Sequence, residues 1–405
     1  MDKSKRLASL DALRGFDMMF IMGVAGLIVS ICRLFPDGDN FWLAQQMGHV
    51  DWNGLRHHDT IFPLFIFLAG VSWPFSLSRQ REAGKSTGQI VWKIIRRCLI
   101  LIALGLVYNG IFRLDFKTLR VASVLMRIGI AWAGAALIYL FVKSPWKRGI
   151  IAAAILIGYW LLIRFVPAPD VPGGDPLSLQ GNLVGWVDRK LLLGRLLYDG
   201  GRFDPEGLLS AVPAIVTAML GMFAGDLVRL PDEKMSGGRK TLWLLAAAVV
   251  CGVLAWAWNF DFPINKKLWT SSFVLAVGSY SFACLAIFYY IIDVKGWKKW
   301  AFPLKVIGMN SITIYLLQRI VSISSINNFF FGGLAGLCGD AWGKVIISAG
   351  YVLVCWLILY FLYKKDVFFF FFFFRECLIC STSATHYPLP RRRSLLQTDS
   401  RPSPG

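Results

Sequence analysis

The sequence predicts an all-α, polytopic integral membrane protein with about ten transmembrane helices and its N-terminus in the cytoplasm. Of the 405 residues, 56% are hydrophobic and only 17% are charged, whereas a soluble domain carries roughly 25% charged residues. Apolar runs of about 20 residues, long enough to cross a bilayer, recur along nearly the whole chain. The formal net charge is +19, but the basic residues form short clusters between these runs, as in cytoplasmic loops. We therefore expect the lipid bilayer, and not nucleic acid, as the partner of this charge.

The predicted spans follow one another in order along the chain. They cover residues 13–34, 61–78, 94–112, 121–142, 148–166, 208–228, 241–259, 270–292, 301–323 and 343–363. Uninterrupted apolar runs such as Leu242–Val250 do not fit the alternating pattern of a membrane β-barrel.

Orientation is predicted from the loops that carry basic residues. With the N-terminus inside, most basic clusters fall in cytoplasmic segments, from Lys3 and Lys5 to Lys364 and Lys365. One short outer loop, with Arg113, Lys117 and Arg120, runs against this bias. The balance favours both ends of the membrane domain inside. Two long loops, 35–60 and 167–207, are then outside, and the second contains an amphipathic stretch, 183–197, which either lies along the membrane surface or is part of an ordered loop.

The chain divides into a membrane domain, residues 1–365, and a tail, residues 366–405. The tail holds the run Phe368–Phe374 and then a segment rich in Ser, Arg and Pro with no apolar period. A homopolymer run followed by an abrupt change in composition suggests a reading-frame shift. We predict that the tail is disordered and has no function.

Three of the four histidines cluster in the first long loop. His49, His57 and His58 lie within ten residues of one another, and Asp59 follows at the predicted start of the second span. Imidazole groups near their ordinary pKa of about 6.5 suit acid–base chemistry. The alternative is three solvated loop histidines, with Asp59 complementing the positive end of a helix.

Further polar residues lie where a bilayer disfavours them. Asp11, Arg14 and Asp17 are three residues apart at the start of the first span, so both acids could reach Arg14. The other members of this group are Arg120, Arg127, Asn310 and Ser311. Each is a candidate for binding an anionic or polar ligand, and each could equally be a structural contact between helices.

Several classes of chemistry lack their motifs. No nucleotide-binding loop and no HExxH zinc motif occur. Cys377 and Cys380 form a CxxC without a second pair, so we expect no metal site.

Eight motifs in order resemble the heparan-alpha-glucosaminide N-acetyltransferase family and its bacterial relatives. They are RLASLDALRG (6–15), HVDWNGL (49–55), DTIFPLFIFLAG (59–70), SVLMRIG (123–129), DPEGL (204–208), FPINKKLW (262–269), DVKG (293–296) and GMNSI (308–312). Together they extend from the first predicted span to the ninth.

The resemblance implies a transmembrane enzyme that moves an acetyl group from cytoplasmic acetyl-CoA to the amino group of a glucosamine-type sugar or glycan on the outer side. It implies His49 and Asp59 as catalytic residues. Arg14, Arg120, Arg127, Asn310 and Ser311 are then candidates for binding the donor, although Arg120 and Arg127 lie nearer the predicted outer face and could instead hold the acceptor. Gln318 and Arg319 stand where the resemblance predicts a histidine. We expect a bacterial inner-membrane location, no counterpart of the animal enzyme's N-terminal luminal domain, and allow for a homodimer.

Two other functions fit the same composition. An amino-sugar transporter or permease subunit would also need many helices and a polar interior, although no internal repeat supports it. A membrane O-acyltransferase that shares the Leu-Asp-x-Leu-Arg-Gly pattern would be expected to have a histidine in its first helix, and none occurs between Arg14 and Leu34. The motifs also leave open whether His49 acts as a base or carries the acetyl group itself.

Overall fold

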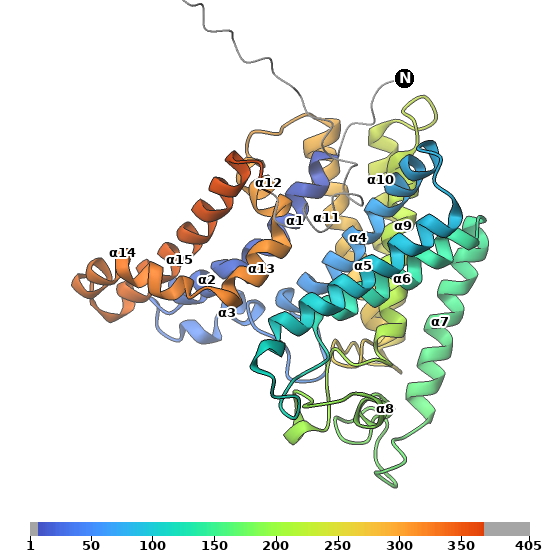
Figure 1. Ribbon diagram of the computed structural model, residues 1–405, viewed down its shortest axis with the longest axis horizontal. Helices are drawn as coiled ribbons and strands as arrows, with labels where there is room; N and C mark the ends of the chain where they lie inside the picture. The colour runs from blue at the N-terminus through green and yellow to red at the C-terminus, as the bar shows by residue number, and fades with distance from the viewer. Residues whose placement is uncertain (1–6, 368–405) are drawn as a thin grey trace, which may run out of the picture.

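A computed structural model describes residues 7–367, and within this range the fold is entirely helical apart from three isolated bridges in the loops (Figure 1). The helices are α1 (Ala8–Met19), α2 (Ala25–Cys32), α3 (Trp42–Gln46), α4 (His57–Glu82), α5 (Thr87–Tyr108), α6 (Val124–Phe141), α7 (Pro145–Phe165), α8 (Leu183–Leu191), α9 (Ala211–Arg229), α10 (Gly237–Asn259), α11 (Ser271–Phe288), α12 (Phe302–Met309), α13 (Ser311–Ile320), α14 (Ile323–Leu337) and α15 (Gly339–Lys364). The predicted tail, 366–405, lies almost wholly outside the described residues.

Eight helical segments of the described chain are long and apolar enough to cross a membrane, or nine if α13 and α14 form one span bent by 80°. The sequence predicted about ten. Part of the difference is α5, which corresponds to the predicted span 94–112 but ends at Tyr108 and contains Lys93, Arg96 and Arg97 in its first half. The rest lies in the predicted span 301–323, which is broken at Asn310, between α12 and α13.

The centre of the bundle is the contact between α4 and α9, which glycines make possible. A Cβ atom at Gly70 would lie 2.1 Å from the carbonyl oxygen of Ala218, and one at Gly221 would lie 2.0 Å from that of Phe67. Backbones can approach this closely only where side chains are absent, which is the usual way in which membrane helices pack. The same device joins α1 to α12, through Gly15 and Gly308.

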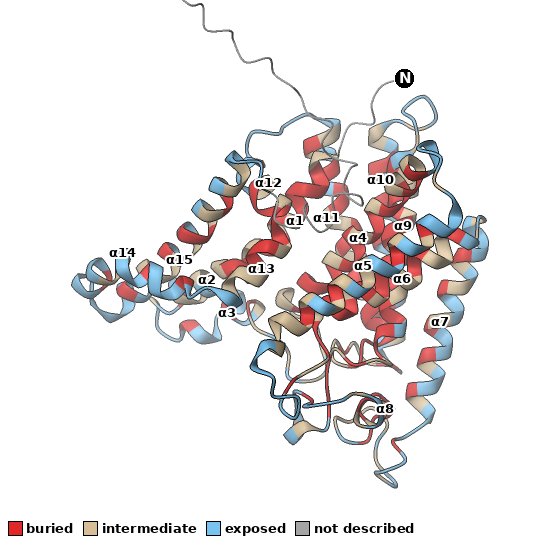
Figure 2. Ribbon diagram, viewed as in Figure 1, coloured by how far each residue is buried: buried red, intermediate tan, exposed pale blue. Residues whose placement is uncertain are grey.

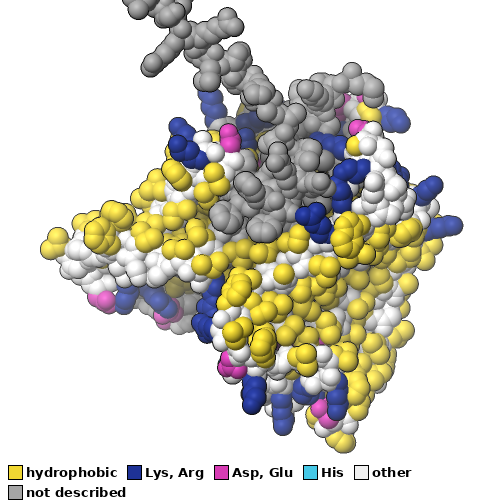
Figure 3. All heavy atoms as spheres, in the orientation of Figure 1, with side chains coloured by type: hydrophobic (Ala, Val, Ile, Leu, Met, Phe, Trp, Pro, Cys, Tyr) yellow, Lys and Arg dark blue, Asp and Glu magenta, His cyan; other side chains and the backbone are white. Residues whose placement is uncertain are grey.

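The peripheral helices α7, α10 and α15 expose most of their surface, in contrast to the buried α4 and α9 (Figure 2). Their exposed side chains are largely apolar, including Trp243 and Val249 of α10 and Leu357 of α15. Hydrophobic side chains cover much of the visible face, and basic groups gather towards its ends (Figure 3). An apolar outer surface of this kind is what a bilayer stabilises, so the protein is an integral membrane protein.

The two long loops meet at one end of the bundle. The backbone N–H of Gly54 donates to the carbonyl of Ile264, 2.8 Å away, and the indole N–H of Trp52 donates to the carbonyl of Leu177. Loop 33–56 therefore packs against both the α10–α11 connection and loop 166–210. The amphipathic stretch 183–197 forms helix α8 only as far as Leu191.

Candidate active site

The first turn of α4 fixes a buried carboxylate, that of Asp59. Oδ2 of Asp59 accepts the backbone N–H of Arg56 at 3.1 Å and that of Val50 at 3.4 Å. The bond to Arg56 satisfies the N–H at the N-cap of the helix, and the bond to Val50 ties the preceding loop to the helix. They leave Oδ1 available on the side that faces the loop. Asp59 is only 1% exposed, so this oxygen has a fixed position.

The imidazole of His49 contacts Oδ1 of Asp59. Its Nδ1 lies 2.7 Å from Oδ1 of Asp59. An ionised carboxylate can only accept, so Nδ1 carries a proton, and in the neutral ring the lone pair is on Nε2. The His49 side chain is 51% exposed, and no described residue hydrogen-bonds to Nε2. Its backbone is held as well, because the guanidinium of Arg56 donates to the carbonyl of His49 at 2.9 Å.

Lys266 joins the pair from the loop between α10 and α11. Its Nζ lies 3.3 Å from Oδ1 of Asp59 and 3.2 Å from Nδ1 of His49. Burial lowers the pKa of Lys266, and the Asp59 carboxylate opposes this shift. His49, Asp59 and Lys266 are called the imidazole site below.

The residues on either side of Lys266 contact the first long loop. The side chain of Asn265 donates to Asn53 at 3.0 Å, and the ammonium of Lys267 donates to the carbonyl of Asp51 at 2.5 Å. The following Trp269 is fully buried with a positive φ of 54°, a conformation that costs energy for a residue with a side chain. The sequence reasoning gave Lys266 no role. The motif 262–269 contained it, but nothing in the spacing said that it would meet His49.

His57 and His58 point to different surroundings. Nε2 of His57 lies 3.1 Å from the hydroxyl of Tyr280, and its ring packs on Phe20. The ring of His58 makes an edge contact with the ring of His49, with centroids 4.7 Å apart. Both have a buried Nδ1 without a hydrogen-bond partner among the described residues. Of the three clustered histidines, His49 is the one that combines an exposed side chain with a carboxylate partner.

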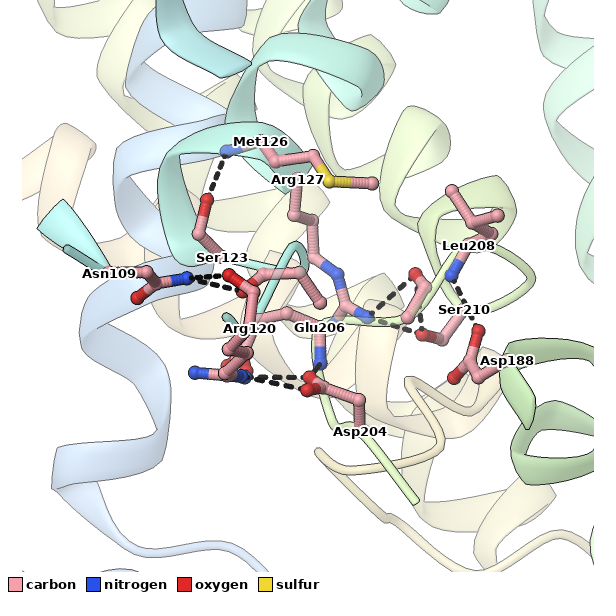
Figure 4. A network of polar contacts seen from close by, with 12 residues as sticks. Asn109, Arg120, Ser123, Met126, Arg127, Asp188, Asp204, Glu206, Leu208 and Ser210 are labelled. Atoms are coloured by element: carbon pink, nitrogen blue, oxygen red, sulfur yellow. Dashed lines mark hydrogen bonds and ion pairs between the residues drawn. The ribbon is translucent and has the colours of Figure 1, made fainter. Parts of the chain in front are cut away.

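The predicted ligand-binding arginines, Arg120 and Arg127, lie in a second polar cluster, called the arginine network (Figure 4). The guanidinium of Arg120 donates to both oxygens of Asp204, at 2.6 and 2.7 Å, and also to Glu206. These carboxylates raise the pKa of Arg120 although burial alone would lower it. The guanidinium of Arg127 donates to the hydroxyl of Ser210 and, at 3.3 Å, to the carbonyl of Gly207.

The segment 204–210 supplies all these partners, which explains the motif at 204–208. Asp188 of α8 accepts the N–H of Leu208 at 2.9 Å, and a Cβ on Gly207 would lie 1.8 Å from Oδ2 of Asp188. Burial raises the pKa of Asp188 to about 7. Arg120 and Arg127 thus already have internal partners, and their assignment to donor binding remains a prediction.

The remaining predicted residues lie around the crossing of α1 with α12. Arg14 pairs with Asp11 at 3.4 Å and donates to the hydroxyl of Ser72 at 2.5 Å. Asp17 has one buried oxygen without a hydrogen-bond partner in the described chain.

Asn310 and Ser311 stand at the break between α12 and α13. Both are buried, and neither the amide nitrogen nor the amide oxygen of Asn310 has a partner among the described residues. An unsatisfied buried amide is costly, and the assignment of Asn310 and Ser311 to donor binding remains a prediction. Near the end of α13, Gln318, one of the two residues found instead of a histidine, donates to the hydroxyl of Tyr351 at 3.1 Å.

Fold and site together define a class: an α-helical integral membrane protein with a carboxylate-oriented imidazole where its loops meet. No protein-family model matches the chain. The chain is 27% identical to human heparan-alpha-glucosaminide N-acetyltransferase, over 90% of its own length and 59% of the human protein. The mouse protein of the same name is equally similar, with 60% of its length covered. The chain thus spans about three fifths of these relatives, and the resemblance in the motifs is confirmed.

Proposed function

We propose that this protein is a transmembrane acetyltransferase. It takes the acetyl group of cytoplasmic acetyl-CoA and transfers it to the amino group of a glucosamine-type sugar on the other side of the membrane. The observation that carries this proposal is the half-exposed imidazole of His49, whose Nδ1 is held 2.7 Å from the buried Asp59. Its support is the similarity to the two N-acetyltransferases.

Amide formation from a thioester requires an amine lone pair and a leaving thiolate. Nε2 of His49 can take a proton from the amine as it attacks the thioester carbon. Alternatively, Nε2 attacks first, the carbon–sulfur bond breaks, and the acetyl group passes from His49 to the amine. In both routes the thiolate leaves with a proton as CoA. Asp59 orients the ring and stabilises the positive charge that forms on it, as carboxylates do beside catalytic histidines.

Transfer of labelled acetyl groups tests the proposal directly. Purified protein should move radiolabel from acetyl-CoA to glucosamine, and His49→Ala should not. Incubation without the sugar separates the two routes, because only the second leaves acetate on His49. An intact wild-type protein that transfers no acetyl group to any amino sugar, but carries the sugar across a vesicle membrane, would favour the transporter instead.

The proposed sidedness needs its own measurement. With the N-terminus inside, the loop before His49 faces outward. Asn40 is exposed, whereas a side chain at the nearby Gly38 would collide with the carbonyl of Cys32. In a background without native cysteines, Asn40→Cys should react with an impermeant thiol reagent in intact cells. Labelling only after lysis would show that this loop lies in the cytoplasm and that the proposed orientation is wrong.

A further inference from the structure

We propose that Lys266 is a positioning residue that keeps His49 uncharged and ready to react, an inference that rests on the proposed function of His49. The geometry that assigns this role is a triangle of three contacts. Nδ1 of His49, Oδ1 of Asp59 and Nζ of Lys266 are separated by 2.7, 3.2 and 3.3 Å.

The proton positions follow from what each group can donate. Asp59 accepts the Nδ1 proton of His49, so the ammonium of Lys266 cannot also donate to that nitrogen and donates to Oδ1 of Asp59 instead. Its charge nevertheless lies 3.2 Å from the imidazole ring. The carboxylate and the ammonium cancel, and the imidazole site is neutral when His49 is neutral.

The ammonium opposes an effect that the carboxylate alone would produce. A carboxylate beside an imidazole favours the charged imidazolium, which has no lone pair on Nε2 and can act neither as base nor as nucleophile. Two positive charges at about 3 Å repel one another, so Lys266 makes the imidazolium less favourable. Asp59 can therefore fix the ring without trapping it in the protonated form.

The groups around Lys266 act on its own pKa in both directions. Burial lowers the pKa of Lys266, and Arg127 acts in the same direction. Asp59 and Glu206 oppose them. On the helix side, the ring of His58 makes an edge contact with the ring of His49, and Arg56 donates to the backbone of His49. Within the described residues, Lys266 is the cationic side chain that lies within 3.2 Å of Nδ1.

The neighbouring Lys267 provides a matched control. It belongs to the same loop, yet its ammonium donates to the carbonyl of Asp51 and lies over the ring of Tyr198 at 4.6 Å. Lys267→Met thus removes an equal charge close by without touching the triangle. Lys266→Arg keeps the positive charge. Lys266→Gln removes the positive charge but keeps a hydrogen-bond donor to Asp59.

The test measures the fraction of neutral imidazole and needs no acceptor sugar. Diethyl pyrocarbonate acylates neutral histidine, and trypsin cleaves after Arg56, which separates the peptide of His49 from that of His57 and His58. The rate of modification of His49 is followed by mass spectrometry from pH 5 to 9 in detergent. In Lys266→Met and Lys266→Gln the midpoint of the pH dependence of His49 modification should rise by about one pH unit. In Lys266→Arg and Lys267→Met it should equal that of the wild type.

Acetyl transfer should follow the same titration. At low pH the Lys266→Gln variant should be about tenfold slower than the wild type, and the difference should shrink as the pH rises. An unmoved midpoint in both charge-removing variants, or the same rise in Lys266→Arg, overturns the inference. Because the titration does not depend on acetyl transfer, such a result leaves the proposed function standing. A His49→Ala protein that still transfers acetyl groups would contradict the proposed function, whatever the modification midpoints show.

Discussion

Two charged clusters lie at the loop end of the bundle, and they differ in whether the central side chain keeps an atom without a hydrogen-bond partner. In the arginine network, the guanidinium of Arg120 is matched by the carboxylates of Asp204 and Glu206. In the imidazole site, Asp59 holds one nitrogen of His49, the side chain is half exposed, and the other nitrogen has no hydrogen-bond partner among the described residues. A closed set of partners stabilises structure, whereas a held group with a free reactive atom supports chemistry. The following predictions test this contrast, from the largest expected effect to the smallest.

Removing Arg120 should destabilise the fold. Arg120→Met leaves Asp204, which is fully buried, without its charge partner, and breaking such a pair costs about 3–5 kcal/mol. Arg164→Met is the control, because Arg164 and Asp261 form an exposed pair worth less than about 1 kcal/mol. Thermal unfolding in detergent measures both. If Arg120→Met were as stable as the wild type but failed to bind acetyl-CoA, the arginine would be a ligand-binding group after all.

Removing His49 should abolish activity with little effect on folding. We expect His49→Ala to slow acetyl transfer by at least about 10²-fold, the lower range for loss of a general base. The unfolding temperature should hardly change, since the side chain is half exposed. His57→Ala and His58→Ala should have milder effects on the rate. Near-normal activity of His49→Ala beside an inactive neighbour would show that the wrong histidine was assigned.

The stability of the arginine network should depend on pH through Asp188. Burial raises the pKa of Asp188 to about 7, above its value of about 3.9 in an unfolded chain. The folded state therefore holds a proton that the unfolded state releases, and stability falls as the pH rises from about 4 to 7.

Asp188→Asn should remove this dependence. The amide keeps an acceptor for the N–H of Leu208 and carries no charge at any pH. Thermal unfolding at pH 5 and pH 8 should show a smaller difference in the variant than in the wild type. Equal differences in the two proteins would mean that Asp188 is ionised in the fold throughout this range.

The smallest effect is expected from the tail. The last helix, α15, ends at Lys364, and the residues after Val367 offer no periodic apolar face to bury. A chain that stops after Lys365 should express, unfold and transfer acetyl groups like the full chain. Reduced activity at equal expression would give the tail a role, and resequencing the gene through the phenylalanine run would show whether the reading frame is real.

The sequence by itself determined the class of fold and much of the site. Apolar runs of about 20 residues leave the backbone no choice but helix in a bilayer, and the clustering of histidines beside Asp59 pointed to the loop end. What it could not determine were contacts between segments far apart in the chain. Lys266 is 217 residues from His49, and Arg120 is 84 residues from Asp204.

The break in the predicted span 301–323 was hidden for a related reason. Hydropathy reports how apolar a stretch is, but not whether its neighbours let it continue as one helix. Gly308 brings α12 against the carbonyl of Asp11, α12 ends at Met309, and α14 then departs at 80° from α13. Composition thus determines that a segment is helical and apolar. The tertiary structure decides where it bends and which distant charge it meets, because only packing fixes those distances.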